Sequence, residues 1–266
     1  QANIVNGRGT FNGSLSGRRG SQFDLQLSGD IAPDRIAAAA RGHYGGQTIT
    51  MPRRAVLVKQ PDGSWQLQKT QMTFGGGIAI AEGQFGGAHG MQMSLSLAKL
   101  PLTLVDIGGA DLGLGGSISG IVDFHTGQRG APTGEARVMV SGLTRAGLLL
   151  TSRPVDLALV AQLTPTLLQA RAVLQDKGQM LGRLQGRIAN LPPDGALFDR
   201  LSAGDLYAQL RYQGPADALW RLAAVEAFDV TGTINVAADV RGSLANPQVR
   251  GSVAGDNLRV QSVLTG

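Results

Sequence analysis

The chain of 266 residues lacks cysteine and is poor in histidine, lysine and aromatic residues. Without cysteine it can form neither a disulfide nor a thiolate metal site, a composition compatible with the periplasm. Aromatic residues make up 5% of the chain, too few to alternate with arginine as base-stacking platforms, so nucleic-acid binding is not expected. No run of about 18 uncharged apolar residues occurs, so no helical membrane span is expected.

Motifs of catalysis are also missing. The three histidines, His43, His89 and His125, lie in unrelated glycine-flanked contexts without metal-ligand spacing. The glycine-rich residues 72–90 lack the lysine and hydroxyl residue of a phosphate-binding loop, and no Gly-x-Ser-x-Gly elbow occurs. We expect Asp123 and Asp239 on a solvent face rather than as a catalytic pair. The sequence therefore predicts a non-catalytic protein with no metal and no cofactor.

Glycine is abundant, with 39 residues, about twice the usual share of roughly 7%. Apolar residues make up 42% of the chain and recur with period 2, which is typical of strands joined by tight turns. We therefore predict an all-β fold with a few short helices: an elongated, curled β-sheet or β-solenoid trough with a hydrophobic interior. The apolar side of such a sheet must be buried, by a second sheet, by coiling into a filled β-helix, or by bending into a trough.

A repeated unit organises the second half. Residues 116–124, GSISGIVDF, align with residues 232–240, GTINVAADV, at an offset of 116. A helix-compatible run precedes each copy (100–108 and 216–227), and a proline-containing turn and second strand follow. Fixed spacing indicates a repeat architecture. We expect one continuous solenoid with segments 1–97, 98–215 and 216–266, and the start at Gln1 suggests a piece of a longer polypeptide.

Several local patterns are less decisive. Propensity favours helix for residues 34–41, but the neighbouring strands favour strand, which we predict. Residues 164–175 fit a helix or a strand equally, because Thr164-Pro165 is a helix-start signal while the leucines and alanines that follow alternate. Met180 is expected on the apolar side of its strand with Leu184 and Ile188, and Leu181 on the opposite side with Arg183, Gln185 and Arg187. Asp194 could cap one helical turn.

The apolar parity of the predicted strands supplies the candidate groove lining. These residues are Phe23, Leu25, Leu27, Met91, Met93, Leu95, Leu97, Ile118, Val122, Phe124, Val138, Val140, Leu157, Leu159, Leu184, Ile188, Leu206, Leu210, Ile234, Val236, Val240, Val249 and Val253. The opposite parity carries arginines: Arg137, Arg183, Arg187, Arg211, Arg250 and Arg259. With a net charge of +5, this face is a solvated surface or one that meets anionic lipid or nucleic acid.

The repeat phrases resemble the TamB family, the translocation and assembly module proteins of the AsmA-like superfamily. The resemblance rests on LAKLPLTL (97–104) leading to DLGLGGSISG (111–120), and on GTINV (232–236), VRGSLANP (240–247), VRGSV (249–253) and NLRV (257–260). It covers most of the chain, most clearly 91–144 and 204–263, although family members are far longer.

This resemblance implies a periplasmic protein anchored in the inner membrane by parts outside this segment. Phospholipid or other acyl chains would lie in its hydrophobic trough on the way between the inner and outer membranes. The outer-membrane barrel TamA is the implied partner, again through parts outside this segment. Three alternatives remain open: a chaperone-like scaffold that receives strands of outer-membrane proteins or autotransporters, a filled β-helix that acts as a spacer, and a basic nucleic-acid binder.

Overall fold

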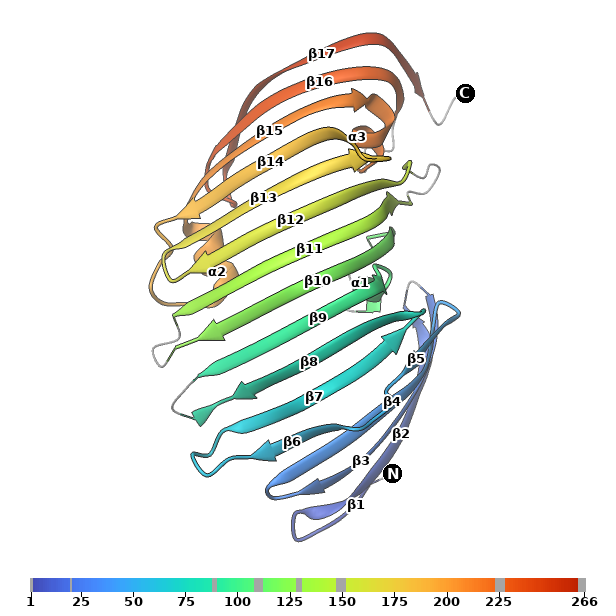
Figure 1. Ribbon diagram of the computed structural model, residues 1–266, viewed down its shortest axis with the longest axis vertical. Coiled ribbons are helices and arrows are strands. Elements are labelled where there is room, and N and C mark those ends of the chain that lie inside the picture. Colours follow the sequence, from blue (N-terminus) through green and yellow to red (C-terminus); the bar gives the residue numbers. More distant parts are fainter. Residues whose placement is uncertain are drawn as a thin grey trace. The chain divides into compact units, whose positions relative to one another are not determined.

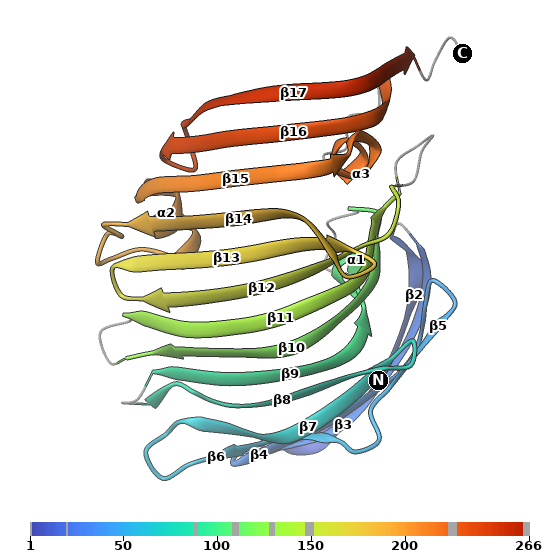
Figure 2. The same ribbon diagram turned by 45° about the horizontal axis from the view of Figure 1, so that its top comes forward.

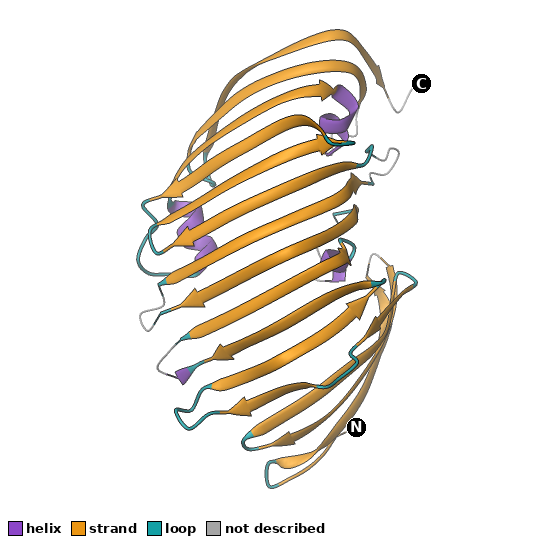
Figure 3. Ribbon diagram, in the orientation of Figure 1, coloured by secondary structure: helices purple, strands orange, loops and turns teal. Residues whose placement is uncertain are grey.

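The computed structural model describes residues 2–19, 21–87, 90–107, 112–127, 131–146, 152–222 and 228–262. It is nearly all β, as the composition predicts, with seventeen strands in one antiparallel sheet and three short helices among the described residues (Figures 1 and 3). The chain divides into two compact units. Unit 1 holds residues 1–111 and 118–131, and unit 2 holds residues 112–117 and 132–266.

Unit 1 contains the first nine strands, helix α1 and most of β10. Their bounds are β1 Ala2–Val5, β2 Arg8–Arg19, β3 Ser21–Ala32, β4 Arg35–Tyr44, β5 Gln47–Thr50, β6 Ala55–Lys59, β7 Trp65–Phe74, β8 Gly77–Phe85, β9 Met91–Pro101, α1 Leu104–Ile107 and β10 Leu114–Thr126. Strands adjacent in sequence pair antiparallel, with one exception. The short strands β5 and β6 each pair with β4 on one side and with β7 on the other. The strands twist and bend, so the sheet of this unit curls (Figure 1).

Unit 2 continues the same up-and-down order. Its elements are β11 Pro132–Arg145, β12 Val155–Thr164, β13 Leu167–Asp176, β14 Gln179–Ala189, α2 Leu197–Ala203, β15 Asp205–Pro215, α3 Ala216–Leu222, β16 Phe228–Gly242 and β17 Pro247–Ser262. Helices α2 and α3 lie at opposite ends of its strands (Figures 1 and 2). Among the described residues, no helix is both long enough and apolar enough to cross a membrane.

The unit 1 core lies on the apolar side of the curled sheet. Tyr44, Ile49, Phe74, Ala79 and Leu100 are buried together. Ile49 on β5 and Phe74 on β7 are cross-strand partners. Through this pair, apolar side chains of the β3–β4 hairpin and of strands β7 to β9 belong to one cluster.

The unit 2 core forms where α3 packs on the sheet. Ala216 and Ala218 of the helix are fully buried against Val155, Leu181 and other residues of the cluster. Small side chains allow this close approach. The helix is held by polar contacts as well, since Arg221 donates to both carboxylate oxygens of Asp229, and this hydrogen-bonded pair raises the pKa of Arg221.

The predicted repeat is confirmed by its glycines. Gly116 and Gly232, equivalent at the offset of 116, have φ values of 101° and 109°. A Cβ would lie 2.6 Å from a backbone carbonyl oxygen in both cases, that of Gly142 for Gly116 and that of Asn257 for Gly232. Only glycine fits such a conformation with such a neighbour. Each copy runs helix, strand and second strand: α1, β10 and β11, then α3, β16 and β17.

Local predictions met different outcomes. Residues 35–41 are strand, as predicted, and Asp34 lies in the preceding turn. In the ambiguous 164–175 region, Thr164 ends β12, residues 165–166 form a turn and the rest is strand β13. The helix expected over 100–108 is shorter: β9 continues through Pro101, α1 occupies Leu104–Ile107, and Gly108 lies outside the described residues, as do 223–227 of the second predicted helix. The Asp194 cap is wrong, because α2 begins after Ala196, which makes no side-chain capping bond.

The prediction for Leu181 is also wrong. Leu181 is 7% exposed and belongs to the unit 2 core, whereas Met180 is 60% exposed. The β13–β14 register shifts between Leu174 and Gln175, so Gly182 pairs with Leu174 but Met180 pairs with Gln175. A shift of one residue reverses which side chains face the core, because strand side chains alternate.

Candidate functional site

One face of the unit 2 sheet is lined by apolar residues from seven consecutive strands. Directly opposed residues of antiparallel strands point to the same side of a sheet, so the pairing registers define the face. Four cross-strand rows compose it: Val140, Leu157, Leu174, Gly182, Tyr212, Val236, Val253; Val138, Leu159, Ala172, Leu184, Leu210, Ala238, Gly251; Ala136, Ala161, Ala170, Gly186, Ala208, Val240, Val249; Gly134, Leu163, Leu168, Ile188, Leu206, Gly242, Pro247. We call this surface the unit 2 apolar face.

Exposure along this face is graded. Tyr212 is 2% exposed because it lies in the core beside α3, and its row is the one nearest that helix. Leu184, in the adjacent row, is 46% exposed, and Val249 and Val253 on β17 are 65% and 69% exposed. The other predicted lining residues of unit 2 are buried or half-buried. The side chains are small or of medium size, so the face is smooth and adaptable.

Unit 1 has an apolar face of its own. Phe23 opposes Tyr44 across β3 and β4, and Leu97 opposes Ala79 across β8 and β9. The Ile49–Phe74 pair connects these two regions, so the predicted residues of β3 and β9 share one side of the sheet. Most are half-buried, and Leu27 is 44% exposed. On β10, Ile118, Val122 and Phe124 share one parity and are half-buried, and Ile118 packs on the unit 1 core.

The candidate lining therefore forms a coherent face in each unit, but it was incomplete. Residues that the structure adds include Tyr44, Ile49, Phe74, Leu163, Leu168, Leu174 and Tyr212. Alternation marked several of them, including Leu168, Leu174 and Tyr212. The sequence of the segment that holds Leu168 and Leu174 fits a helix or a strand equally, because its helix-start signal competes with the alternation.

The opposite side of the unit 2 sheet is polar and basic. The predicted outward arginines of β11, β14, β15 and β17 lie on it, opposite the apolar rows. Arg211 pairs with Asp239 at 2.9 Å and Arg137 pairs with Glu135 at 3.2 Å. Asp239 therefore serves as the partner of an arginine on the polar face, and Asp123 is exposed.

Chemistry-bearing side chains do not converge in the described part of the chain. No group of three or more histidine, aspartate and glutamate residues is arranged there to hold a metal ion. His43 lies 3.2 Å from a carboxylate oxygen of Asp24, and both side chains are more than half exposed. His125 is exposed on β10, and His89 lies outside the described residues.

Comparison of the chain with models of protein families, with curated proteins and with solved structures finds no match.

Proposed function

We propose that this chain is a segment of a periplasmic TamB-like protein, tethered to the inner membrane elsewhere, whose apolar faces bind phospholipid acyl chains during transport between the inner and outer membranes. The role is non-catalytic and requires no cofactor. TamA would be engaged by parts outside this segment.

The unit 2 apolar face carries this proposal. Its four rows run across seven strands without a charged side chain, and its exposure rises from Tyr212 towards Leu184 and the β17 valines. Soluble proteins rarely leave a continuous apolar surface of this kind exposed unless it binds something. Each methylene that an acyl chain buries on it contributes about 0.8 kcal/mol.

Leu184 is the sharpest position for a test. Val236→Asp would be a less specific test, because Val236 packs on the unit 2 core and opposes Tyr212, so this change would also destabilise the fold. Leu184 lies in the interior of the same face and is 46% exposed, so aspartate there remains hydrated while placing a charge among the apolar rows. Met139, 51% exposed on the polar side of β11, offers the matched control.

The measurement is native mass spectrometry with lipid extraction on protein purified from expressing cells. We expect wild type and Met139→Asp to carry phospholipid and Leu184→Asp to lose it, with unchanged circular dichroism in all three. An empty wild-type protein, or equal lipid content in Leu184→Asp, would refute the acyl-chain role.

Strand β17 favours a second candidate function, reception of a strand from an outer-membrane protein or autotransporter. β17 spans sixteen residues, and all but the last are exposed. Within the described residues it pairs with β16 alone, which leaves one edge of backbone donors and acceptors open to β-augmentation. A photo-crosslinking residue at Ser252 would attach to such a strand in cells, whereas attachment to lipid alone would argue against this role.

A further inference from the structure

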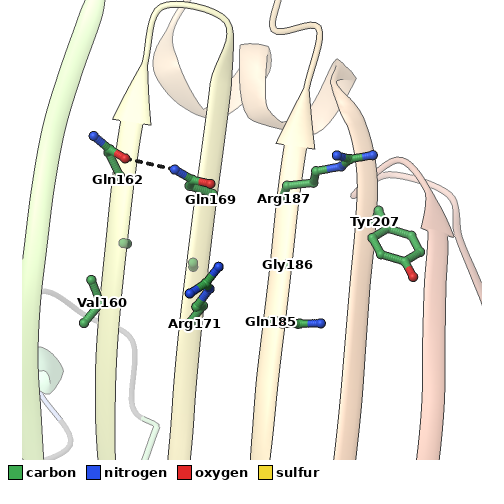
Figure 4. A pocket seen from close by; sticks show the side chains of 10 residues that line it. Val160, Gln162, Gln169, Arg171, Gln185, Gly186, Arg187 and Tyr207 are labelled. Atoms are coloured by element: carbon green, nitrogen blue, oxygen red, sulfur yellow. Dashed lines mark hydrogen bonds between the residues drawn. The ribbon is translucent and has the colours of Figure 1, made fainter.

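The polar side of unit 2 holds a hollow of about 390 Å³ over β12, β13, β14 and β15 (Figure 4). Its lining is Val160, Ala161, Gln162, Gln169, Ala170, Arg171, Gln185, Gly186, Arg187 and Tyr207. The only charged groups in this lining are two guanidinium groups. The longer side chains of this lining have the parity opposite to the unit 2 apolar face, whereas Ala161, Ala170 and Gly186 belong to one of the apolar rows. The arginines of the hollow therefore lie on the other side of the sheet from the acyl-chain surface.

The two arginines are diagonal neighbours. Arg171 opposes Gln185 and Arg187 opposes Gln169 across β13 and β14. Diagonal pairs in a sheet have Cα atoms about 7–8 Å apart, within reach of a single ligand for side chains of this length. In the structure the Arg187 side chain is turned towards Tyr207 (Figure 4). An anion bound between the two arginines would offset the repulsion between their charges.

No carboxylate of the described residues pairs with either arginine. The cross-strand row of Arg171 runs from Arg137 through Val160, Gln185 and Gln209 to Asp239. The row of Arg187 runs from Glu135 through Gln162, Gln169 and Tyr207 to Arg241. The carboxylates of Glu135 and Asp239 already have partners, Arg137 and Arg211 respectively. Asp205, diagonal to Arg187 on β15, accepts a hydrogen bond from Asn190. No ion pair of the described residues therefore neutralises Arg171 or Arg187.

Neighbouring side chains hold the site in order. The Tyr207 ring lies between two arginines, with Arg187 and Arg241 at 5.8 and 5.7 Å from its centroid. A guanidinium held over an aromatic ring keeps N–H groups free to donate at its edge. Two amide pairs order the lining: Gln169 donates to Gln162 at 2.9 Å (Figure 4), and Gln185 donates to Gln209 at 2.7 Å.

We propose that Arg171 and Arg187 form a binding site for a phosphate-type oxyanion. Two guanidinium groups match the oxygens of a phosphate through charge-assisted, bidentate hydrogen bonds. The anion is the phosphodiester of a phospholipid headgroup or free inorganic phosphate, which share this chemistry.

The test compares wild type with Arg171→Gln/Arg187→Gln and with a control, Arg137→Gln/Arg250→Gln, which removes the same charge from the same side of the sheet. Inorganic phosphate is titrated at constant ionic strength, and the arginine Nε–H resonances are followed by NMR. Separate samples are mixed with vesicles of phosphatidylcholine alone or with phosphatidylglycerol. Unchanged thermal unfolding shows that each variant is folded.

We expect the Arg171/Arg187 variant to lose phosphate affinity by about tenfold or more and the control to lose less than about threefold. Phosphate binding without vesicle binding supports the free anion, and vesicle binding lost with the same pair supports the headgroup. Equal loss in both variants would overturn the site in favour of a diffuse basic surface. Absence of binding to both probes, or vesicle binding that survives the double substitution, would also overturn it.

Discussion

The phenol of Tyr212 donates a 2.7 Å hydrogen bond to the carbonyl oxygen of Pro215, the last residue of β15, which directly precedes α3. The ring is 2% exposed and belongs to the unit 2 core. Burial, and next the nearby Asp217 carboxylate, raise the pKa of Tyr212 to about 12.

This pKa predicts a loss of stability at alkaline pH. Above pH 10 the unfolded chain releases the phenol proton while the folded protein retains it, so the free energy of unfolding falls by about 1.4 kcal/mol per pH unit between pH 10 and about 12. Urea unfolding across this range measures the slope. Tyr212→Phe should be less stable at neutral pH, because Pro215 loses its donor, yet less sensitive to alkali. An unchanged slope in Tyr212→Phe would contradict the assignment.

The β13–β14 register shift predicts that substitutions at the adjacent residues Leu181 and Met180 differ strongly in their effect on stability. Leu181→Ala should lower the free energy of unfolding by about 2–5 kcal/mol, because it opens a cavity in the unit 2 core. Met180→Ala, at a position 60% exposed, should change it by less than about 0.5 kcal/mol. Chemical denaturation of both variants measures the difference. Similar losses of stability in the two variants, or a larger loss at Met180, would contradict the β13–β14 register described above.

Gly232 predicts a backbone effect. Gly232→Ala should destabilise the protein by roughly 1–3 kcal/mol, since alanine is strained at a φ of 109° and its Cβ would lie 2.6 Å from the carbonyl oxygen of Asn257. Hydrogen exchange should show the loss concentrated in β16 and β17. Gly13→Ala on β2 is the control, because a Cβ there meets nothing within 4 Å. Equal effects at the two glycines would rule out the close approach as the cause.

Strand content and sidedness could be predicted from the sequence because both depend on neighbouring residues. Period-2 alternation places Val138, Leu159 and Leu210 on one side of a sheet wherever their strands pair in register. The repeat offset likewise predicted that Gly116 and Gly232 would be equivalent, since a backbone conformation that favours glycine requires glycine at the same position of each copy.

Pairing across strands decided the rest. Thr164-Pro165 is compatible with a helix start, and only the hydrogen bonds of β13 to β12 and β14 make the residues that follow a strand. Leu181 turned inward because a register shift reversed the parity that local alternation indicates. Arg171 and Arg187, sixteen residues apart in sequence, became neighbours because two strands pair at one register, and no local pattern of charge records that juxtaposition. The sequence by itself determined which side of each strand is apolar, since side-chain alternation is a local property; the tertiary structure decided which strands adjoin, and therefore where exposed apolar surface and uncompensated charge accumulate.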